Sequence, residues 1–541
     1  MSSSRKCVLL TSVFKPFATD DEFGSRAINP AELYHNQVTR AQGPFSLRMF
    51  HRSWGLMFLR ENISAPCTLL DFPTRERFVR ELASHHYDVV GISSIVVNVG
   101  KVQEMCRLVR EHSPHSAIVV GGHVTSIPNL ETTIDADHIV RGEGVAWLRR
   151  FLGEPDDRPI RHPVIRSSFG FRVMGLTMPE GKETASATIV PSVGCPMGCG
   201  FCTTSAFFGG KGKFSNFYER GQELFDVMCD VERRLGTRTF FMMDENFLLY
   251  RRRALELLAC MKAHGKAWSL YVFSSANAIR KYTMRELAEL GIEWIWLGLE
   301  AANSGFQKLA NADTRALTAQ LQAHGICVHG STIVGMEHHT PENIWHDLDH
   351  AIAHETVFHQ FMLYTPMPGT PLHRDMDARG LMRRDVPLAD THGQFKFNFL
   401  HPAISRDQSK ELLDAAFARD FERNGPSLYR LMRTMMARCR RYAADSDPRV
   451  RERVGRAAAQ LRGGYAGALW AMERYFRDSN RAVSQRIGDL RAQISAELGA
   501  QPRLIGPTLG RLLLWTSKRE ERRVATLRLE PRTFVERTNW T

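Results

Sequence analysis

The chain has 541 residues, of which 43% are hydrophobic and 24% are charged, as in a soluble globular protein of about three domains. No run of about 18 apolar residues exists, which excludes a membrane-spanning helix. The formal charge of +13 is concentrated between residues 401 and 541, which hold 28 Lys or Arg and 16 Asp or Glu. Apart from three in the middle of the chain, the ten cysteines are scattered, and no secretory pattern is visible, so we expect a cytoplasmic protein.

Five short apolar runs in the first 150 residues predict buried parallel strands. Helical patterns separate the later runs, and one of them, over residues 102–109, has an apolar face. Alternating strands and helices predict a doubly wound, Rossmann-like domain over residues 1–150, which binds ligands beyond the carboxyl ends of its strands. The five runs are residues 7–13, 65–70, 89–92, 117–120 and 138–140.

Small residues follow three of these predicted strands. Ser93 and Ser94 follow the third, Gly121 and Gly122 the fourth, and Gly142 the fifth. Each alone is typical of an ordinary tight turn. In this order and spacing they resemble cobalamin (B12)-binding domains, in which the serine and the paired glycines line the slot for the nucleotide tail. The resemblance implies that these five residues contact cobalamin.

The loop after the first strand departs from that pattern. Related cobalamin domains of mutases and methionine synthase carry D-x-H-x-x-G there, and its histidine ligates cobalt. Here the loop starts at residues 12–16 as Ser-Val-Phe-Lys-Pro, and an insertion rich in aromatic residues extends to Asn62. We therefore expect no histidine ligand from the protein. His35 and His51, in the insertion, stay open as alternatives, although ordinary loop histidines fit them better.

Residues 151–183 are rich in Pro, Gly, Arg and Ser and predict an irregular linker. Soon after the linker, Cys195, Cys199 and Cys202 are spaced C-x3-C-x2-C, with glycines and a proline between them. Structural zinc needs four ligands and a second cysteine pair, which is absent, and a disulfide needs an even number of cysteines. We favour a [4Fe-4S] cluster with one open iron over zinc or buried structural thiols.

The same stretch resembles the radical S-adenosylmethionine (SAM) enzymes, whose cluster motif has this spacing and an aromatic residue before the last cysteine. Phe201 fills that place. The resemblance implies that the open iron chelates the amino and carboxylate groups of SAM. Reductive cleavage of SAM then gives methionine and a 5′-deoxyadenosyl radical.

Six strand-like runs alternate with helical segments from residue 184 to residue 400. This repeat predicts a partial (β/α)6 barrel, whose active site lies at the carboxyl ends of the strands. Together with the first domain it gives an α/β fold class. The runs are residues 187–190, 239–243, 270–274, 294–299, 327–334 and 358–364.

Polar residues at those strand ends extend the resemblance to radical SAM enzymes. Asp244 and Asn246, in a D-x-N-F stretch similar to that of cobalamin-dependent members, are implied to hold the amino group of SAM. Ser275 could bind the ribose, and Glu300 the ribose or the amine. Residues 333–336 are implied to approach adenine, and residues 364–371 resemble a P-x-P-G-T turn of the same subgroup. Alone, each motif could be a helix cap or a turn.

Residues 401–541 have a basic, mainly helical pattern. Residues 428–439 predict an amphipathic basic helix, and residues 506–515 are rich in glycine and leucine with basic flanks. We expect a helical cap over the barrel mouth with a solvated basic face. Peripheral contact with an anionic membrane is the first alternative. Nucleic acid is the weaker one, since no RNA-binding signature is visible.

The combined resemblance implies a cobalamin-dependent radical SAM methyltransferase. It would methylate an unactivated carbon of a small molecule or lipid, using methylcobalamin and the 5′-deoxyadenosyl radical. We expect a monomer that takes electrons from an external flavodoxin- or ferredoxin-like donor. No general acid or base can be named.

Three other functions stay open at this point. The first is a cobalamin-dependent radical SAM cyclase or rearrangement enzyme that transfers no methyl group. The second is an RNA-modifying enzyme similar to methylthiotransferases, which carry a second cysteine trio in the N-terminal domain. Only Cys7, Cys67 and Cys106 are available there, widely spread. The third is a catalytically silent cobalamin-binding protein.

Overall fold

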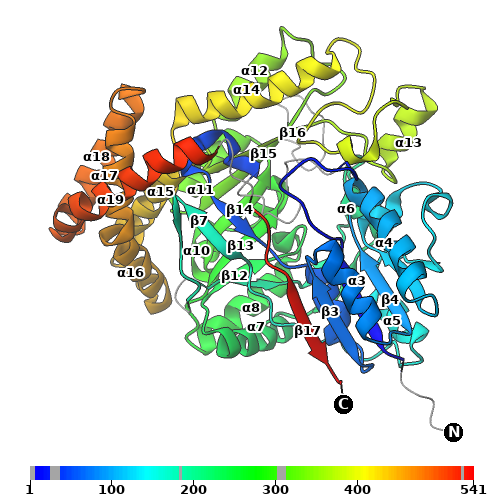
Figure 1. The fold of residues 1–541 in the computed structure, drawn as a ribbon. Coiled ribbons are helices and arrows are strands. Elements are labelled where there is room, and N and C mark those ends of the chain that lie inside the picture. Colours follow the sequence, from blue (N-terminus) through cyan, green and yellow to red (C-terminus); the bar gives the residue numbers. More distant parts are fainter. Residues whose placement is uncertain (1–5, 25–36, 182–184, 301–311, 525–528, 541) are drawn as a thin grey trace.

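The computed structural model describes residues 6–24, 37–181, 185–300, 312–524 and 529–540. It contains two six-stranded sheets built mainly from parallel strands, with a helical region after the second (Figure 1). The predicted α/β fold class is therefore confirmed. His35 and the rest of residues 25–36, and residues 301–311 after Glu300, lie outside the described residues.

The five predicted strands of the first domain form one sheet in the order β3-β1-β4-β5-β6. Helix α4 (Val99–His112) packs on this sheet with the predicted apolar face, including Val102 and Val109, fully buried. Because all five strands are parallel, their carboxyl ends share one edge, where the predicted cobalamin residues lie. The strands are β1 (Val8–Ser12), β3 (Cys67–Asp71), β4 (Val89–Ser93), β5 (Ala117–Gly121) and β6 (His138–Ile139).

A sixth strand of this sheet comes from the far end of the chain. Strand β17 (Phe534–Thr538) pairs antiparallel with β3, so the carboxyl-terminal region, which the sequence predicts to be mainly helical, also adds a strand to the first domain. Glu536 of β17 bonds to Arg52 at 2.7 Å and also pairs with Arg60. The strand thereby covers the edge of β3, which would otherwise expose unpaired backbone groups.

The predicted irregular linker also contains regular structure. Strands β7 (Phe169–Val173) and β8 (Leu176–Thr177) form a small antiparallel sheet with β2 (Arg48–Phe50) of the insertion. The expectation of irregular packing over 151–183 is wrong there. These strands are short, and their partner lies more than a hundred residues earlier, so no local period reveals them.

The second sheet has its six parallel strands in strict chain order, as a partial barrel requires. Alternate residues of most of these strands face the surrounding helices and form a large apolar core that includes Phe240, Val272 and Leu297. Helices α7 (Gly221–Leu235) and α8 (Arg251–Ala263) cover part of this outer face. The strands are β9 (Ala187–Ile189), β12 (Thr239–Met242), β13 (Ser269–Ser274), β14 (Ile292–Gly298), β15 (Cys327–Val334) and β16 (Phe358–Leu363).

The helices after the barrel cover the end opposite to the one we expected. Buried Arg438 of α15 (Ser427–Tyr442) donates to the carbonyl oxygen of Gly325 at 2.9 Å, just before β15 begins. Arg453 of α16 (Pro448–Arg462) donates to carbonyl oxygens of Trp268 and Ala288, which precede β13 and β14. These contacts lie at the amino ends of the strands, so the predicted cap over the barrel mouth is wrong.

The basic helix predicted over residues 428–439 lies within α15 and is largely buried. Its arginines are paired inside the molecule: Arg430 with Asp420 at 2.9 Å, and Arg438 with Glu293 at 2.7 Å. This helix therefore offers little surface to a membrane or a nucleic acid. None of the helices in the described part of the chain is both long and apolar enough to cross a bilayer.

Candidate functional site

The cysteine loop follows β9 and the short strand β10 (Ser192–Val193) and is shaped by glycine. Gly198 has a φ of +68°, and a Cβ atom there would lie 2.5 Å from the Cβ of Lys211, so only glycine fits. Cys202 caps the short helix α6 (Thr203–Phe207), and its Sγ accepts the N–H of Ser205 at 3.5 Å. The Ser205 hydroxyl donates to the carbonyl oxygen of Cys195 at 3.1 Å. The loop is thus held in place by its own hydrogen bonds.

The three thiols suit a large inorganic cluster better than a single zinc ion. Tetrahedral zinc would bring sulfur atoms to about 3.8 Å from one another, given its bond length to sulfur. Among the described residues, one trio of candidate ligand atoms lies mutually within 4.8 Å, and it does not include these cysteines. Burial raises the pKa of the Cys195 thiol to about 11, so cluster binding must release protons there.

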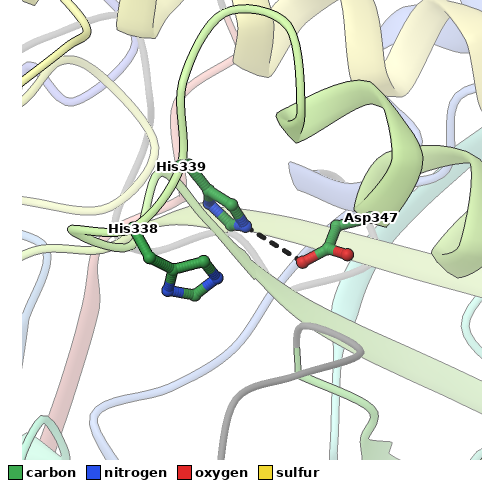
Figure 2. A group of neighbouring side chains, drawn as sticks. All are labelled: His338, His339 and Asp347. Carbon is green, nitrogen blue, oxygen red and sulfur yellow. Dashed lines mark hydrogen bonds and ion pairs between the residues drawn. The ribbon is translucent and has the colours of Figure 1, made fainter.

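The trio within 4.8 Å is His338, His339 and Asp347 (Figure 2). Nδ1 of His339 accepts the backbone N–H groups of Gly335 and Met336, at 3.1 and 3.0 Å. The proton therefore sits on Nε2, which donates to Asp347 at 3.0 Å. Both ring nitrogens are hydrogen-bonded within the protein, so we interpret His339 as a residue that fixes the loop after β15 rather than as a metal ligand. The sequence predicts that this loop contacts adenine.

Asp244, at the end of β12, is buried and forms an ion pair with Arg253 of α8. It also accepts the backbone N–H of Asn246 at 3.1 Å. Arg253 donates further to the Asn216 side chain and the Tyr218 carbonyl oxygen, both at 3.3 Å. In this structure Asp244 therefore shapes the turn after β12 through its ion pair with the outer helix.

Glu245 is the site residue that the sequence reasoning missed. Glu245 lies in the turn after β12, close enough to the cysteine loop for its charge to act on two of the thiols. Its negative charge adds to the rise in pKa that burial gives the thiols of Cys195 and Cys202. Burial, and then the charge of Asp244, raises the pKa of Glu245 itself to about 7. Its place between Asp244 and Asn246, two predicted site residues, was the signal that could have found it.

Asn246 joins the ends of β12 and β13. Its Oδ1 accepts the Ser274 hydroxyl and the Ser275 backbone N–H, both at 3.1 Å. Its Nδ2 donates to the Ser275 hydroxyl at 3.2 Å. The structure therefore brings together Asn246 and Ser275, two residues that the sequence assigns to the SAM site.

Glu300 and Phe201 also lie near strand ends. Glu300 follows β14, is buried, and has a φ of +52°, which is strained for a residue other than glycine. Its backbone N–H donates to the carbonyl oxygen of Ser331 on β15 at 3.1 Å. Phe201 is half-buried against the apolar cluster around β16.

The predicted cobalamin residues meet at the carboxyl edge of the first sheet. Gly122 has a φ of +81°, and a Cβ there would lie 2.6 Å from the carbonyl oxygen of Ser94. A Cβ at Gly121 would meet no protein atom within 4 Å, and at Gly142 the nearest is 3.8 Å away. Two buried polar atoms here, the Ser94 hydroxyl and Nδ1 of His123, have no hydrogen-bond partner among the described residues. Close backbone approach beside unsatisfied polar atoms fits a bound cobalamin tail.

The loop after β1 is held from two sides. Buried Lys101 of α4 donates to the carbonyl oxygen of Phe14 at 3.2 Å and pairs with Asp21 at 3.0 Å. Glu530, just before β17, accepts the backbone N–H groups of Phe17 and Ala18 at 3.0 and 2.8 Å. This is the loop that carries a cobalt-ligating histidine in the related domains named above.

His51 is engaged within its own segment of the insertion. Its Nδ1 is hydrogen-bonded to the carbonyl oxygen of Arg52 at 3.1 Å, and its ring lies 5.1 Å from that of Trp54. Burial lowers the pKa of His51. The absence of a histidine ligand to cobalt stays a prediction.

The two predicted cofactor sites adjoin each other. The His123 ring, directly after Gly122, lies 4.5 Å from the ring of Phe207 at the end of α6. A Cβ at Gly369, in the turn after β16, would lie 3.0 Å from the Cβ of Ser126 in the first domain. The backbone N–H of Leu372 donates to the carbonyl oxygen of Gly200 at 2.9 Å. The cysteine loop therefore faces the edge of the first sheet.

Comparison with known proteins gives the same two domains. Residues 57–152 match the B12 binding domain, and residues 189–351 match the Radical SAM superfamily. The chain is 27% identical over 334 residues to bacteriochlorophyllide d C-12(1)-methyltransferase of Chlorobaculum tepidum, covering 58% of this chain and 70% of that protein. It is 23% identical over 315 residues to hopanoid C-3 methylase of Methylococcus capsulatus, covering 52% and 58%.

A solved structure shares the fold. The radical SAM methyltransferase TsrM from Kitasatospora setae, with cobalamin and a [4Fe-4S] cluster bound, superposes with a TM-score of 0.54 at 16% identity, covering 84% of this chain and 99% of that one. The three predicted cofactors, cobalamin, a [4Fe-4S] cluster and SAM, are those of the two matched domains. The chain thus joins a B12-binding domain to a radical SAM domain and is homologous to cobalamin-dependent radical SAM methyltransferases.

Proposed function

We propose that this protein methylates an unactivated carbon of an apolar, ring-bearing small molecule. The observation that carries the proposal is the contact between the two cofactor sites, made by His123 with Phe207 and by Ser126 with Gly369. A methyl donor on the first sheet and a radical generator on the barrel must reach the same substrate carbon. The contacts between the two domains support this requirement, because they bring the carboxyl edges of both sheets together.

When bound, the cluster and SAM supply a 5′-deoxyadenosyl radical that abstracts hydrogen, and cobalamin supplies the methyl group. Cys195, Cys199 and Cys202 would hold the cluster. Glu245, which lies near the cysteine loop, would accept hydrogen bonds from the ammonium group of SAM. The ion pair of the neighbouring Asp244 would fix the turn that carries Glu245.

We keep the other SAM and cobalamin contacts that the sequence predicts. Asn246, Ser275 and Glu300 would bind the ribose or amine of SAM. The cobalamin tail would lie along the edge of the first sheet, with the buried Ser94 hydroxyl available to it as a hydrogen-bond donor. Its remaining contacts would be Ser93, Gly121, Gly122 and Gly142. We retain the expectations of a monomer and of an external flavodoxin- or ferredoxin-like electron donor.

The inner face of the barrel supports the substrate class. In a first row of rings, Tyr271 of β13 lies 4.8 Å from Phe241 of β12 and 5.5 Å from Trp294 of β14. Trp294 in turn stacks on Phe358 of β16 at 5.1 Å. Alternate residues of these strands form the outer apolar core, so the rings line the opposite, inner side.

A second row of rings lies on the same face. Phe273 stacks on Trp296 at 4.8 Å, and Trp296 stacks on His329 at 4.0 Å. The residues Tyr271, Phe273, Trp294 and Trp296 are half-buried. Aromatic walls of this kind bind apolar rings by offset stacking and exclude water from reactive intermediates.

The hydrogen bond between the Tyr271 hydroxyl and Nδ1 of His329, 2.8 Å long, is a polar feature of this wall. It places a fixed dipole among the rings. A mostly apolar ligand with a small number of polar groups suits such a surface. The half-buried rings therefore favour an uncharged ring system over a highly charged substrate.

The test is an anaerobic assay of the reconstituted protein, with iron and cobalt measured first. With the true substrate, methyl transfer gives S-adenosylhomocysteine and 5′-deoxyadenosine together. A ring-forming or rearranging enzyme gives 5′-deoxyadenosine without S-adenosylhomocysteine. Bound zinc in place of iron, or no retained cobalamin, would overturn the assignment of both sites.

RNA modification of the methylthiotransferase type is less well supported. It needs a second cluster held by the first domain, yet Cys67 and Cys106 are fully buried in different apolar clusters, on β3 and α4. Cys7, just before β1, packs against the cluster that holds Cys106, whereas Cys67 lies in the other cluster. Three such positions cannot share one cluster without unfolding the domain.

Replacing one inner ring tests the substrate wall. Phe273→Leu removes a stacking partner from the inner face, and we expect kcat/KM for the substrate to fall roughly tenfold, equivalent to about 1.4 kcal/mol. Substrate-independent cleavage of SAM should be unchanged. The matched variant Phe240→Leu, on the outer face, should lower thermal stability instead, because Phe240 is fully buried in the core. Equal effects of the two variants on kcat/KM would contradict an inner-face substrate site.

A further inference from the structure

Helix α19 (Gln501–Val524) has one face packed firmly against α17 (Gly464–Tyr475). A Cβ at Gly510 would lie 2.6 Å from the ring of Trp470, and one at Gly467 would lie 2.7 Å from Leu509, so the two helices approach closely. Leu513 is buried on this face. The face of α19 that packs on α17 therefore fixes the orientation of the helix, and with it the set of side chains that point away from the protein.

The opposite face of α19 exposes large apolar side chains. Leu504 is 75% exposed, Leu512 is 48% exposed and Trp515 is 59% exposed. They are half of the six large hydrophobic side chains that are exposed in the described part of the chain. At 100° per residue the three lie within one sector of the helix surface. Scattered exposed apolar residues are ordinary, whereas a group on one helix face marks an interaction surface.

Positive charge surrounds these side chains. Arg511, Lys518, Arg519 and Arg522 are exposed on the same sector, and the Arg519 guanidinium lies 5.6 Å from the Trp515 ring centroid. Among the described residues none of these four cations forms an ion pair, in contrast to the paired arginines of α15. We call the seven residues Leu504, Arg511, Leu512, Trp515, Lys518, Arg519 and Arg522 the outer α19 face.

The acidic residues of α19 are engaged elsewhere. Glu520 points inward and pairs with Arg172 of β7 at 2.7 Å. Glu521, at the flank, accepts the Tyr475 hydroxyl at 2.8 Å. The outer α19 face is therefore both apolar and cationic, which is the composition of a helix that lies in the plane of an anionic membrane.

We propose that α19 docks this protein on the surface of an anionic lipid bilayer. Leu504, Leu512 and Trp515 would enter the boundary between headgroups and acyl chains, and the basic side chains would bind lipid phosphates. The apolar side chains argue against nucleic acid, whose backbone rewards charge alone. The unpaired cations argue against a second copy of the same face, because symmetric pairing would oppose like charges.

The location of the helix is compatible with docking. Figure 1 shows α19 with α17 and α18 (Arg481–Glu497) at the side of the molecule away from α3 (Arg75–Ser84), α4 and α5 (Val145–Phe151) of the first domain. A flat membrane could therefore meet α19 without covering the junction of the two cofactor sites. The proposal does not depend on the methyltransferase assignment.

Vesicle sedimentation of the full-length protein tests the proposal. We expect binding to vesicles of phosphatidylcholine mixed with phosphatidylglycerol, and little binding to phosphatidylcholine alone. High salt should weaken binding, because screening reduces attraction to the headgroups. The double variant Arg511→Glu/Lys518→Glu should lower affinity at least 25-fold, at about fivefold for each basic side chain removed. The variant Leu512→Gln/Trp515→Gln should also lose binding, and to a similar extent at low and high salt.

Two controls keep the result specific. Leu400→Gln changes an exposed apolar side chain, 49% exposed, outside α19, and should leave binding unchanged. Circular dichroism should show that all variants melt as the parent does, because every changed side chain is exposed. Undiminished binding by both α19 double variants, or no binding of the parent protein to anionic vesicles, would overturn the proposal. So would a dimer in solution that Trp515→Gln converts to monomers, since the face would then belong to a second copy.

Discussion

Gly121 and Gly122 are neighbours in the chain but have different surroundings. A Cβ at Gly122 would collide with the carbonyl oxygen of Ser94, whereas a Cβ at Gly121 would enter space that no protein atom occupies within 4 Å. A side chain at Gly121 should therefore change the stability of the cobalamin-free protein little. It should weaken cobalamin binding if cobalamin occupies that space.

We accordingly expect Gly121→Ala to leave thermal stability unchanged and to lower retained cobalamin. Gly122→Ala should lower both, because it combines a clash with a φ of +81°. The control Gly55→Ala, in α2 (Trp54–Glu61), has free space and should change neither. Absorbance of bound cobalamin after desalting, and melting of the cobalamin-free protein, are the measurements. Full cobalamin retention by Gly121→Ala would remove this residue from the predicted binding site.

For individual residues, the sequence predicted which side chains share a strand edge but not the directions in which they point. The order of motifs predicts that Asp244, Asn246 and Ser275 share one strand edge, and the structure joins Asn246 to Ser275 directly. That Asp244 pairs with Arg253 depends on how α8 packs against β12. Such a contact is set by tertiary packing and leaves no mark in the local pattern, so the sequence could not show that Asp244 pairs with the outer helix.

Strand β17 is the element that the sequence reasoning could least anticipate. Its five residues give a weak strand signal, and its partner β3 is more than 450 residues earlier in the chain. The strongly periodic elements were predictable, because buried parallel strands read as continuous apolar runs. The small sheet of β2, β7 and β8 escaped prediction for the same reason as β17.

Ending the chain after residue 528 removes β17 together with Glu530 and should expose the edge of β3. We expect amide hydrogens of β3 to exchange at least tenfold faster, because they lose pairing and cover. Retained cobalamin should fall, since Phe17 and Ala18 lose the carboxylate that holds their loop. Exchange in β13 and β14 should not change, and a uniform increase across both sheets would contradict a local role for β17.

Across the whole molecule, buried neutral histidines should make stability depend on pH. Burial lowers the pKa of His359 to about 3 and that of His354 to about 4. An unfolded histidine titrates near pH 6.5, so the unfolded chain binds more protons below that value. Stability is therefore full above about pH 6.5 and falls as the pH drops toward 4, by at most about 1.4 kcal/mol per unit for each histidine.

Urea denaturation between neutral and mildly acidic pH measures this dependence. His359→Gln should reduce the slope of unfolding free energy against pH. It should also lower stability at neutral pH, because the Thr332 and Thr356 hydroxyls each lose a hydrogen bond to the ring. The control His346→Gln replaces a histidine that is 80% exposed and should leave the slope close to that of the parent. A parent slope of zero over this range would show that these histidines are not held neutral.

The return of β17 to the first sheet also sets an order of assembly on the ribosome. The strands β1 to β6 emerge early, but β3 keeps an open edge until the barrel and all the later helices have been translated. The loop after β1, which Glu530 holds, is thus fixed only after the end of the chain has been translated. Loading of cobalamin would then be a late event in maturation, and a prematurely terminated chain would offer it only an unfinished binding site.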